Sequence, residues 1–347
     1  MGGAEIFTRE VAKRWVAAGH EVTLFTSEFQ GCKNAEVVDG VKVVRAGGRY
    51  SVYWKAKKFY KRFFSKEGYD VVVDEINTRP FFTPSFVRNG EKIVALIHQL
   101  AKEYWFYETP FPFSYIGYYL LEPRWLRKYV SIPTITVSES TKQDLLDLGL
   151  SKVYVVSEGL SFQPCEKVSE KEGDPICIYI GRLTRAKRFH YLLGAFKLVK
   201  TDVPHAKLWV LGDGYERNEL EKNAPDTVSF FGHVLDRKKI KLMKRAWVLV
   251  NPSVREGFGL NIIEANACGT PCIAFKVSGL KDTIKHGETG LLVDTNDIEG
   301  LAAAIKRIFR EEAFRHELSE NALRYSRQFN WDKTSRDMLE IIKMFTD

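Results

Sequence analysis

The sequence predicts an α/β protein with two doubly wound domains, each built on a mostly parallel sheet. Three observations lead to this prediction. With 347 residues, the chain exceeds the size at which a single hydrophobic core usually stops growing. Strand and helix patterns alternate from one end to the other, as they do in βαβ units. A polar, proline-containing stretch, residues 162–175, separates two halves that follow the same plan.

These observations also set the domain boundaries. We place the first domain at residues 1–163 and the second at residues 164–330. The last segment, residues 331–347, is expected to form a helix that packs back on the first domain.

Strand-like segments occur at similar spacing in both halves. In the first half they are Glu21–Thr26, Val41–Arg45, Asp70–Asp74, Lys92–Ile97, Thr134–Val137 and Val153–Val156. In the second half they are Pro175–Ile180, Lys207–Leu211, Val228–Phe231, Trp247–Val250, Pro271–Phe275 and Gly290–Val293. Sheets of this kind bind ligands at the carboxyl ends of their strands, so two such domains facing each other would surround a central cleft.

Composition excludes several classes of protein. The apolar content of 45% is ordinary for a globular protein. The longest apolar, aromatic-rich run, Phe111–Leu121, is well short of the about 20 residues that span a bilayer, so no transmembrane helix is expected. The five cysteines contain no Cys-x-x-Cys pair, which favours a reducing cytoplasm. Cys268 and Cys272 flank Gly-Thr-Pro and are interpreted as small buried residues rather than metal ligands.

The net charge of +8 indicates an anionic partner. Nucleic acid is not expected, because no helix-turn-helix, zinc-ligand or RNP-like pattern accompanies the charge. The basic, aromatic stretch Trp54–Lys66 sets Ala56, Phe59, Tyr60 and Phe63 at helical spacing. Such a helix either binds an anionic membrane surface or packs on the first sheet with a solvated cationic face.

A second aromatic stretch, Glu103–Tyr115, has seven aromatic residues in thirteen. It could form an acceptor pocket or an interfacial anchor, because aromatic rings suit both places.

The most informative motif is Glu256-Gly-Phe-Gly-Leu-Asn-Ile-Ile-Glu264, which follows a strand pattern and runs into a helix pattern. Its order places the N–H groups of Phe258, Gly259 and Leu260 at a helix N-terminus, where an anion is favoured. Carboxylates accept hydrogen bonds from sugar hydroxyls. The motif could therefore hold a polyol and an anion together, as a sugar nucleotide requires. Glutamates near a helix start are common for structural reasons. The residues around the motif must therefore distinguish a ligand-binding role from a structural one.

The run from Asn251 to Ala274 resembles the signature of the retaining glycosyltransferases of family 4, which have the GT-B fold. The resemblance implies two Rossmann-like doubly wound domains that face each other across a cleft. It places Glu264 at the ribose hydroxyls of a nucleotide sugar and Glu256 beside the donor sugar. It also implies that the sugar is held mostly by main chain, from Gly257 to Leu260.

Two further stretches support the same resemblance. Residues 180–188 are similar to the family's Gly-Arg-Leu-x-x-x-Lys-Gly, which implies that Gly181, Arg182 and Lys187 lie at the donor's diphosphate. The family's final glycine is Arg188 here. Residues 211–214 resemble the family's Gly-x-Gly turn near the nucleotide base, where Gly212 would bind the donor. The same residues could equally form a tight strand-to-helix turn.

The first domain carries the remaining candidates. The N-terminal Gly2 and Gly3 resemble the loop that follows the first, central strand of the family's sheet, beside the diphosphate. We expect either that the reading frame continues upstream into a short apolar strand or that the sheet lacks its central strand. His98 follows an apolar strand pattern and is either a satisfied structural group or, as in the family, a residue facing the donor sugar. The stretch Ser157-Glu-Gly159 departs from the family's Pro-Asn-Gly.

Together these features predict a glycosyltransferase that moves a hexose from a nucleotide diphosphate sugar to a hydroxyl acceptor, and the resemblance implies that the transfer is retaining. The acceptor is expected to be lipid-linked or a growing surface glycan. Glu256, His98, Arg182 and Lys187 are the expected catalytic residues. No Asp-x-Asp motif occurs where a metal-dependent transferase would need one, so neither a metal nor another cofactor is expected. The protein is expected in the cytoplasm, peripheral on the inner face of the membrane.

Two alternatives remain at this point. One is a nucleotide-sugar epimerase of the same fold, which would isomerise the sugar nucleotide without an acceptor. The other is an inactive, membrane-associated protein that binds sugar nucleotides.

Overall fold

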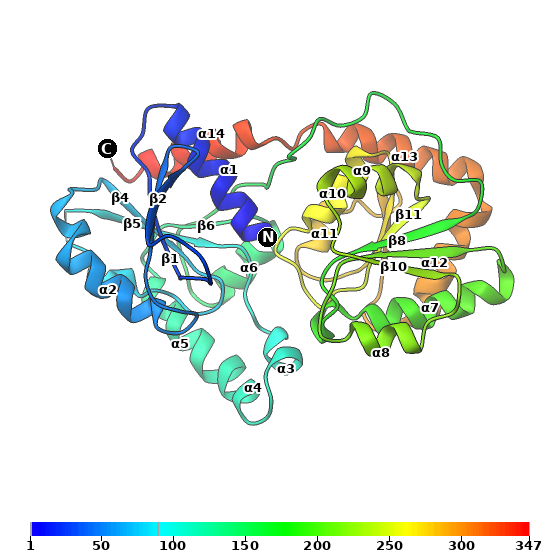
Figure 1. The fold of residues 1–347 in the computed structure, drawn as a ribbon, viewed down its shortest axis with the longest axis horizontal. Coiled ribbons are helices and arrows are strands. Elements are labelled where there is room, and N and C mark those ends of the chain that lie inside the picture. The colour runs from blue at the N-terminus through cyan, green and yellow to red at the C-terminus, as the bar shows by residue number, and fades with distance from the viewer. Residues whose placement is uncertain (1, 89, 347) are drawn as a thin grey trace. The chain divides into compact units, whose positions relative to one another are not determined.

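The computed structural model describes residues 2–88 and 90–346, which divide into two compact units (Figure 1). Unit 1 comprises Met1–Lys102, Tyr115–Gly159 and Asn330–Asp347. Unit 2 comprises Glu103–Ser114 and Leu160–Phe329. The short segment Glu103–Ser114 thus belongs to unit 2, although the residues on both sides of it belong to unit 1.

Unit 2 contains a six-stranded sheet in which every neighbouring pair is parallel. Its strands are β8 (Ile176–Ile180), β9 (Lys207–Leu211), β10 (Val228–Gly232), β11 (Val248–Asn251), β12 (Cys272–Phe275) and β13 (Gly290–Val293). Their order is β10-β9-β8-β11-β12-β13, so the winding direction reverses between β8 and β11. In doubly wound sheets the loops that leave the two strands at this point diverge and form the ligand crevice.

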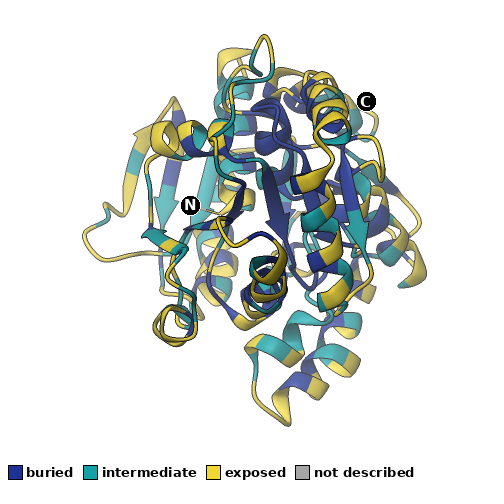
Figure 2. Cartoon of the chain, turned by 90° about the vertical axis from the view of Figure 1, so that its right-hand side faces the viewer, coloured by how far each residue is buried: buried dark blue, intermediate teal, exposed yellow. Residues whose placement is uncertain are grey.

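Helices cover both faces of this sheet. On one face α7 (Phe189–Asp202) and α12 (Ile298–Arg310) share a core with Cys177 and Tyr179 of β8. On the other, α9 (Asp236–Arg245) and α10 (Leu260–Ala267) share a core with the alternate residues Ile176 and Ile178. Strands buried on both faces need continuous apolar sequences, which explains why they were recognisable. Figure 2 shows the buried residues gathered on the strands and the inward helix faces.

The strands of unit 1 form two separate sheets. The first has the order β1-β3-β2, from β1 (Thr23–Thr26), β2 (Ala35–Val38) and β3 (Val41–Arg45). The second has the order β4-β5-β6-β7, from β4 (Val71–Glu75), β5 (Lys92–Ile97), β6 (Thr134–Thr136) and β7 (Val153–Val155). The pairs are parallel except for β2 with β3. Within the described residues, β1 and β4 each have a strand neighbour on one side only.

The other helices complete both units. They are α1 (Gly3–Ala17), α2 (Val52–Arg62), α3 (Tyr104–Glu108), α4 (Phe113–Ile116), α5 (Glu122–Leu126), α6 (Glu139–Asp147), α8 (Arg217–Lys222), α11 (Leu280–Thr283), α13 (Glu312–Ser326) and α14 (Trp331–Lys343). Short 3-10 turns occur at Phe64–Lys66, Thr83–Ser85, Arg127–Tyr129 and Arg185–Lys187, and a π-helical turn at Gly117–Leu121. None of the helices in the described residues is both long and apolar enough to cross a membrane.

The predicted aromatic helix needs a correction. The helix α2 buries Val52, Ala56 and Tyr60, but Phe63 lies beyond its end and is 44% exposed. The chain leaves the α-helical conformation at Phe63 and enters a 3-10 turn, which brings Phe64 instead to the ring of Phe25 at 6.0 Å. Helical spacing alone could not show this early end.

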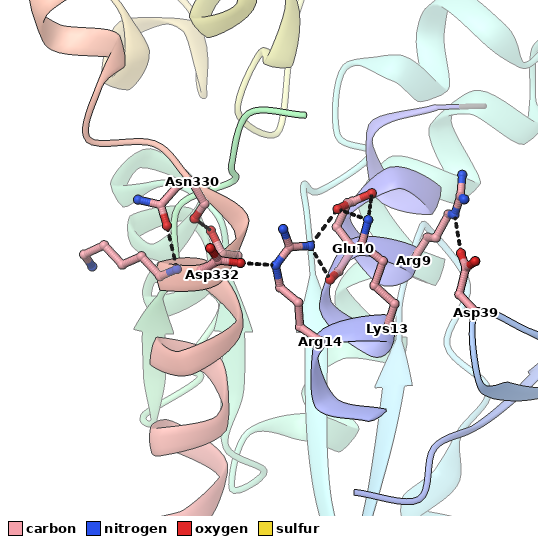
Figure 3. A network of polar contacts seen from close by, with 9 residues as sticks. Arg9, Glu10, Lys13, Arg14, Asp39, Asn330 and Asp332 are labelled. Carbon is pink, nitrogen blue, oxygen red and sulfur yellow. Dashed lines mark hydrogen bonds and ion pairs between the residues drawn. The ribbon is translucent and has the colours of Figure 1, made fainter. Parts of the chain in front are cut away.

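In unit 1, α14 packs along α1. The Trp331 ring is buried and meets Phe7 edge-on, with 5.7 Å between ring centroids. The indole of Trp15 donates a hydrogen bond to the carbonyl of Ser335 at 3.1 Å. Arg14 bridges the largely buried Glu10 at 2.7 Å and the exposed Asp332 at 2.6 Å (Figure 3). The contact therefore has a buried aromatic centre and an ionic rim whose outer partner, Asp332, is exposed.

We predict that the aromatic centre carries most of the stability of this contact. Trp331→Ala should destabilise unit 1 by about 3–5 kcal/mol, because it empties a fully packed site. Asp332→Ala, the control, should cost less than about 1 kcal/mol, because exposed ion pairs contribute little. Urea unfolding followed by circular dichroism would measure both. Equal losses for the two variants would contradict this view of the contact.

Candidate functional site

The centre of the candidate site is an ion pair between Lys187 and Glu256. Lys187 lies in the loop that leaves β8, and Glu256 in the loop that leaves β11, so the pair sits at the reversal of the strand order. The Lys187 Nζ is 2.6 Å from the Glu256 Oε1. Both side chains are largely buried, with exposed fractions of 13% and 17%. The same carboxylate oxygen accepts hydrogen bonds from Ser253 Oγ at 2.7 Å and Asn251 Nδ2 at 3.4 Å.

Electrostatics keep both partners charged. Burial lowers the pKa of Lys187, but the Glu256 carboxylate and the Tyr104 hydroxyl outweigh it, so the pKa is raised. Burial raises the pKa of Glu256, but Lys187, Ser253 and Asn251 outweigh it, so that pKa is lowered. The pair therefore stays ionic at neutral pH. A buried charge is tolerated only when its partner and hydrogen bonds are in place.

Two glycines in the loop after β9 allow its backbone to pack directly against the backbone of the loop after β8. A Cβ atom at Gly212 would lie 1.9 Å from the carbonyl oxygen of Gly181, and Gly212 has a φ of +134°. A Cβ at Gly214 would lie 2.1 Å from the Leu183 carbonyl oxygen. Because no side chain fits there, Leu183 can donate a backbone hydrogen bond to Asp213 at 2.9 Å. The two glycines thus support the loop that carries Arg182, whose side chain is exposed.

The helix that follows Glu256 in the motif begins, as predicted, directly after Gly259, and its N-terminus has no side-chain cap. This helix, α10, starts at Leu260, and the φ of Gly259 is +92°. Phe258 is buried against Phe329, whereas Gly257 is half-buried. The backbone N–H groups at this helix start can therefore receive an oxygen of a bound ligand.

Glu264 lies on α10 and is also paired. Its Oε1 is 2.8 Å from Lys239 Nζ on α9, and Glu264 is 9% exposed. Burial lowers the pKa of Lys239, but Glu264 outweighs it and raises the pKa. Nearby, Asn261 donates from Nδ2 to the Ile180 carbonyl at 2.8 Å, which ties the start of α10 to the end of β8.

The segment Glu103–Glu108, which is distant in the sequence, also packs around Lys187. The Tyr104 ring centroid is 5.9 Å from Lys187 Nζ, and its hydroxyl donates to the Arg255 carbonyl at 3.3 Å. Glu103 pairs with the buried guanidinium of Arg255 at 2.7 Å. Glu108 accepts a hydrogen bond from the Ala186 N–H at 3.1 Å. The first part of the aromatic stretch 103–115 thus packs on both loops that carry the ion pair.

The remaining predicted residues lie in unit 1. His98 follows β5, and its two ring nitrogens are 3.6 Å from Glu75 Oε1 and 3.5 Å from Glu158 Oε1. Burial lowers the pKa of His98, but the two carboxylates outweigh it and raise the pKa to about 9. Gly2 and Gly3 are exposed at the start of α1, where the Gly2 N–H donates to Glu5 at 2.8 Å.

Of the predicted residues, Lys187 and Glu256 are in direct contact in unit 2, whereas Gly2, Gly3 and His98 lie in unit 1. Sequence reasoning did not find Ser253, Tyr104, Lys239, Glu75 and Glu158. Ser253 could have been found, since it lies three residues before Glu256 in the run from Asn251 to Ala274. The described residues include no group of three or more His, Cys, Asp or Glu side chains placed to hold a metal ion. Cys268 and Cys272 are fully buried in unit 2.

Both halves of the chain match known protein families. Residues 1–163 match the family model described as Glycosyltransferase Family 4, and residues 165–325 match that of Glycosyl transferases group 1. The capsular polysaccharide biosynthesis glycosyltransferase CapM of Staphylococcus aureus is 28% identical over 253 residues, covering 65% of this chain and 66% of CapM. This chain spans about two thirds or less of the length of the curated relatives it matches.

Solved structures show the same fold. Sucrose-phosphate synthase from Thermosynechococcus elongatus has a TM-score of 0.81 at 23% identity, covering 99% of this chain and 93% of that one. Anabaena HepE in complex with UDP-glucose has a TM-score of 0.72 at 16% identity, covering 99% and 97%. The predicted fold class, GT-B, is thereby confirmed.

We predict that His98 is protonated at neutral pH because of Glu158. Its pKa of about 9 in the folded state exceeds the ordinary 6.5. Its contribution to stability is therefore fully present below pH 6.5 and is lost as the pH rises through about 9. Glu158→Gln should lower the pKa of His98, measured by NMR titration of the imidazole. The control Glu139→Gln removes an exposed carboxylate elsewhere in unit 1 and should not change it. An unchanged pKa in Glu158→Gln would contradict the assignment.

A second prediction concerns the central ion pair. Lys187→Met should destabilise unit 2 by about 3–5 kcal/mol, because it leaves Glu256 as an uncompensated buried charge. The double variant Lys187→Met/Glu256→Gln should be less destabilised than Lys187→Met alone, since it removes both charges. Urea unfolding of the three proteins would compare them. A double variant that is the least stable of the set would show that the charges do not depend on each other.

Proposed function

The chain belongs to glycosyltransferase family 4, and on that premise we propose that it transfers a hexosyl group from a nucleotide diphosphate sugar to a hydroxyl acceptor. The proposed transfer retains the anomeric configuration and needs neither a metal ion nor another cofactor. The observation that carries the proposal is the buried Lys187–Glu256 pair at the reversal of the strand order. This is where doubly wound sheets bind their ligands.

The two charges suit the two halves of such a donor. A diphosphate accepts charge-assisted hydrogen bonds from Lys187 and from the exposed Arg182 in the same loop. The sugar hydroxyls donate to Glu256, and the uncapped start of α10 receives a sugar or phosphate oxygen. Glu264 accepts from the ribose hydroxyls. The UDP-glucose complex of Anabaena HepE supports a nucleotide-sugar donor.

In the proposed reaction the bond between the anomeric carbon and the diphosphate oxygen breaks, and its electron pair stays on the diphosphate. The acceptor oxygen then bonds to the anomeric carbon on the face that the diphosphate leaves. The hydroxyl proton passes to a diphosphate oxygen. Lys187 and Arg182 stabilise the negative charge that grows on the leaving group, which is the work of a metal ion in other transferases. Glu256 stabilises positive charge on the sugar ring.

The acceptor we propose is a lipid-linked hydroxyl compound or a growing surface glycan. The similarity to a capsular polysaccharide biosynthesis glycosyltransferase supports a surface glycan. A peripheral position on the inner face of the cell membrane is supported by the exposed Trp54 of α2, by the exposed Phe63 directly after this helix, by the lysines of α2 and by the net charge of +8.

The test begins with a thermal-shift screen of nucleotide diphosphate sugars, because binding a donor raises the melting temperature. The donor that binds is then incubated with and without glycan and lipid-linked acceptors. Transfer of the sugar to an acceptor would support the proposal. Isomerisation of the sugar nucleotide without acceptor would instead identify an epimerase. Binding without either reaction would identify an inactive sugar-nucleotide-binding protein.

We predict that Glu264→Gln weakens binding of the cognate nucleotide diphosphate sugar by about 10- to 150-fold, since a charge-assisted hydrogen bond is worth about 1.5–3 kcal/mol. Titration calorimetry would measure the change. The matched control is Glu320→Gln, an exposed helical glutamate of unit 2, which should bind the donor as the unchanged chain does. Equal affinity in Glu264→Gln and the control would remove Glu264 from the donor site.

Turnover should also survive excess EDTA, because side-chain cations and helix N-termini stabilise the diphosphate. The initial rate of sugar transfer, measured with and without the chelator, checks this. A rate that falls on chelation and returns with Mg²⁺ or Mn²⁺ would show that a metal is required.

A further inference from the structure

The guanidinium of Arg188 is buried without a counter-ion. Arg188 is 4% exposed, and its Nε and Nη1 atoms have no hydrogen-bond partner. Its Nη2 atom donates to the hydroxyl of Tyr107. Within residues 2–88 and 90–346, no carboxylate lies within ion-pair distance of it. Buried charges are normally paired. The described part of the chain supplies no anionic partner for Arg188, which points to a partner from outside the chain.

Aromatic rings compensate only part of this cost. The Arg188 Cζ lies 4.9 Å from the ring centroid of Tyr107 and 5.5 Å from that of Tyr191. Cation–π contacts of this kind stabilise a cation less than leaving a buried ion unpaired destabilises it. The rings leave the N–H groups at Nε and Nη1 without acceptors. The unsatisfied N–H groups at Nε and Nη1 lie on different edges of the planar guanidinium, so they can donate to two separate oxygens of an anionic ligand.

The position of Arg188 in the fold favours the same class of ligand. Arg188 is the N-cap residue of α7, a helix of 14 residues, and no side chain caps this helix. Its φ of +51° is in the left-handed region, where glycine is favoured, and the family signature has glycine at this position. The positive end of the helix dipole therefore adds to the guanidinium charge.

The loop around Arg188 has a surplus of positive charge. It carries Arg182, Arg185, Lys187 and Arg188 within seven residues. Glu256 neutralises Lys187, and Glu216 lies 3.9 Å from Arg185. In the described part of the chain, Arg182 and Arg188 have no carboxylate partner within ion-pair distance. Water can solvate the exposed Arg182, whereas the buried Arg188 is left without a balancing anion.

We propose that Arg188 and the first turn of α7 form a binding site for a phosphoryl group, in addition to the roles assigned to Lys187 and Arg182. Tyr107 and Tyr191 hold the guanidinium, and Nε and Nη1 each donate to a different oxygen of the bound anion. The phosphoryl group belongs either to the diphosphate of the donor or to a phosphorylated acceptor. This inference concerns anion binding and does not depend on sugar transfer.

The probe for the test is inorganic pyrophosphate, titrated into the full chain at low ionic strength and followed by calorimetry. Arg188→Gly should bind pyrophosphate at least tenfold more weakly than the unchanged chain. Glycine suits the left-handed backbone at this position, so the variant should fold, which circular dichroism checks. Arg188→Lys keeps the charge but loses the planar group with its several N–H donors, and it should also bind more weakly. The control Arg185→Ala removes an exposed cation of the same loop and should change the affinity less than twofold.

A purely structural role makes a different prediction. If Arg188 only fastens α3 through Tyr107, then Tyr107→Phe and Arg188→Gly would both lower the melting temperature and leave pyrophosphate affinity unchanged. That result would overturn the proposal. Unchanged affinity in Arg188→Gly would overturn it whatever the melting temperature.

Competition distinguishes the two sources of the phosphoryl group. If the cognate nucleoside diphosphate displaces pyrophosphate, Arg188 binds the diphosphate of the donor. If pyrophosphate binds alongside the nucleoside diphosphate and Arg188→Gly abolishes only this second binding, the group belongs to another ligand. Either result supports the site. A chain that binds pyrophosphate through Arg188 but transfers no sugar would refute the proposed function and leave this inference standing.

Discussion

The ion pair between Lys187 and Glu256 is the interaction on which the candidate site depends. Each partner is largely buried, and each would be costly alone. The pair holds together two loops that leave neighbouring strands, and Ser253 and Tyr104 surround it. A ligand with an anionic and a polyhydroxyl part can form contacts with both charges. The pair thus links the stability of unit 2 to its proposed chemistry.

Backbone constraints explain why this pair lies where it does. The reversal of the strand order at β8 and β11 makes their two loops diverge, so a site forms between them. Glycines at 212 and 214 let the next loop approach within hydrogen-bonding distance of the first. The helix α3 then packs on both loops through Glu103, Tyr104 and Glu108. Much of what surrounds the charges is therefore main chain or contributed by a segment distant in sequence.

The sequence was sufficient to predict the strands and the loops that carry Lys187 and Glu256. Strands buried on both faces have continuous apolar sequences, and every predicted strand occurs with its ends shifted by at most two residues. The strand β2 was missed because it is mostly exposed and so lacks the continuous apolar sequence of the other strands. The pairing of Lys187 with Glu256 and the place of Tyr104 could not be predicted, because they depend on how distant loops pack. The unpaired burial of Arg188 likewise appears only when Tyr107 and Tyr191 are seen around it.

Hydrogen–deuterium exchange of the unchanged chain, with and without nucleotide diphosphate sugars, tests the central claim most directly. The account predicts that at least one of these donors slows exchange in residues 181–190 and 256–264 together, because the ligand contacts both loops of unit 2. It also predicts that the corresponding free sugar slows exchange less, since it lacks the diphosphate. Slower exchange confined to other segments, or none with any donor, would show that the Lys187–Glu256 pair is not the donor site.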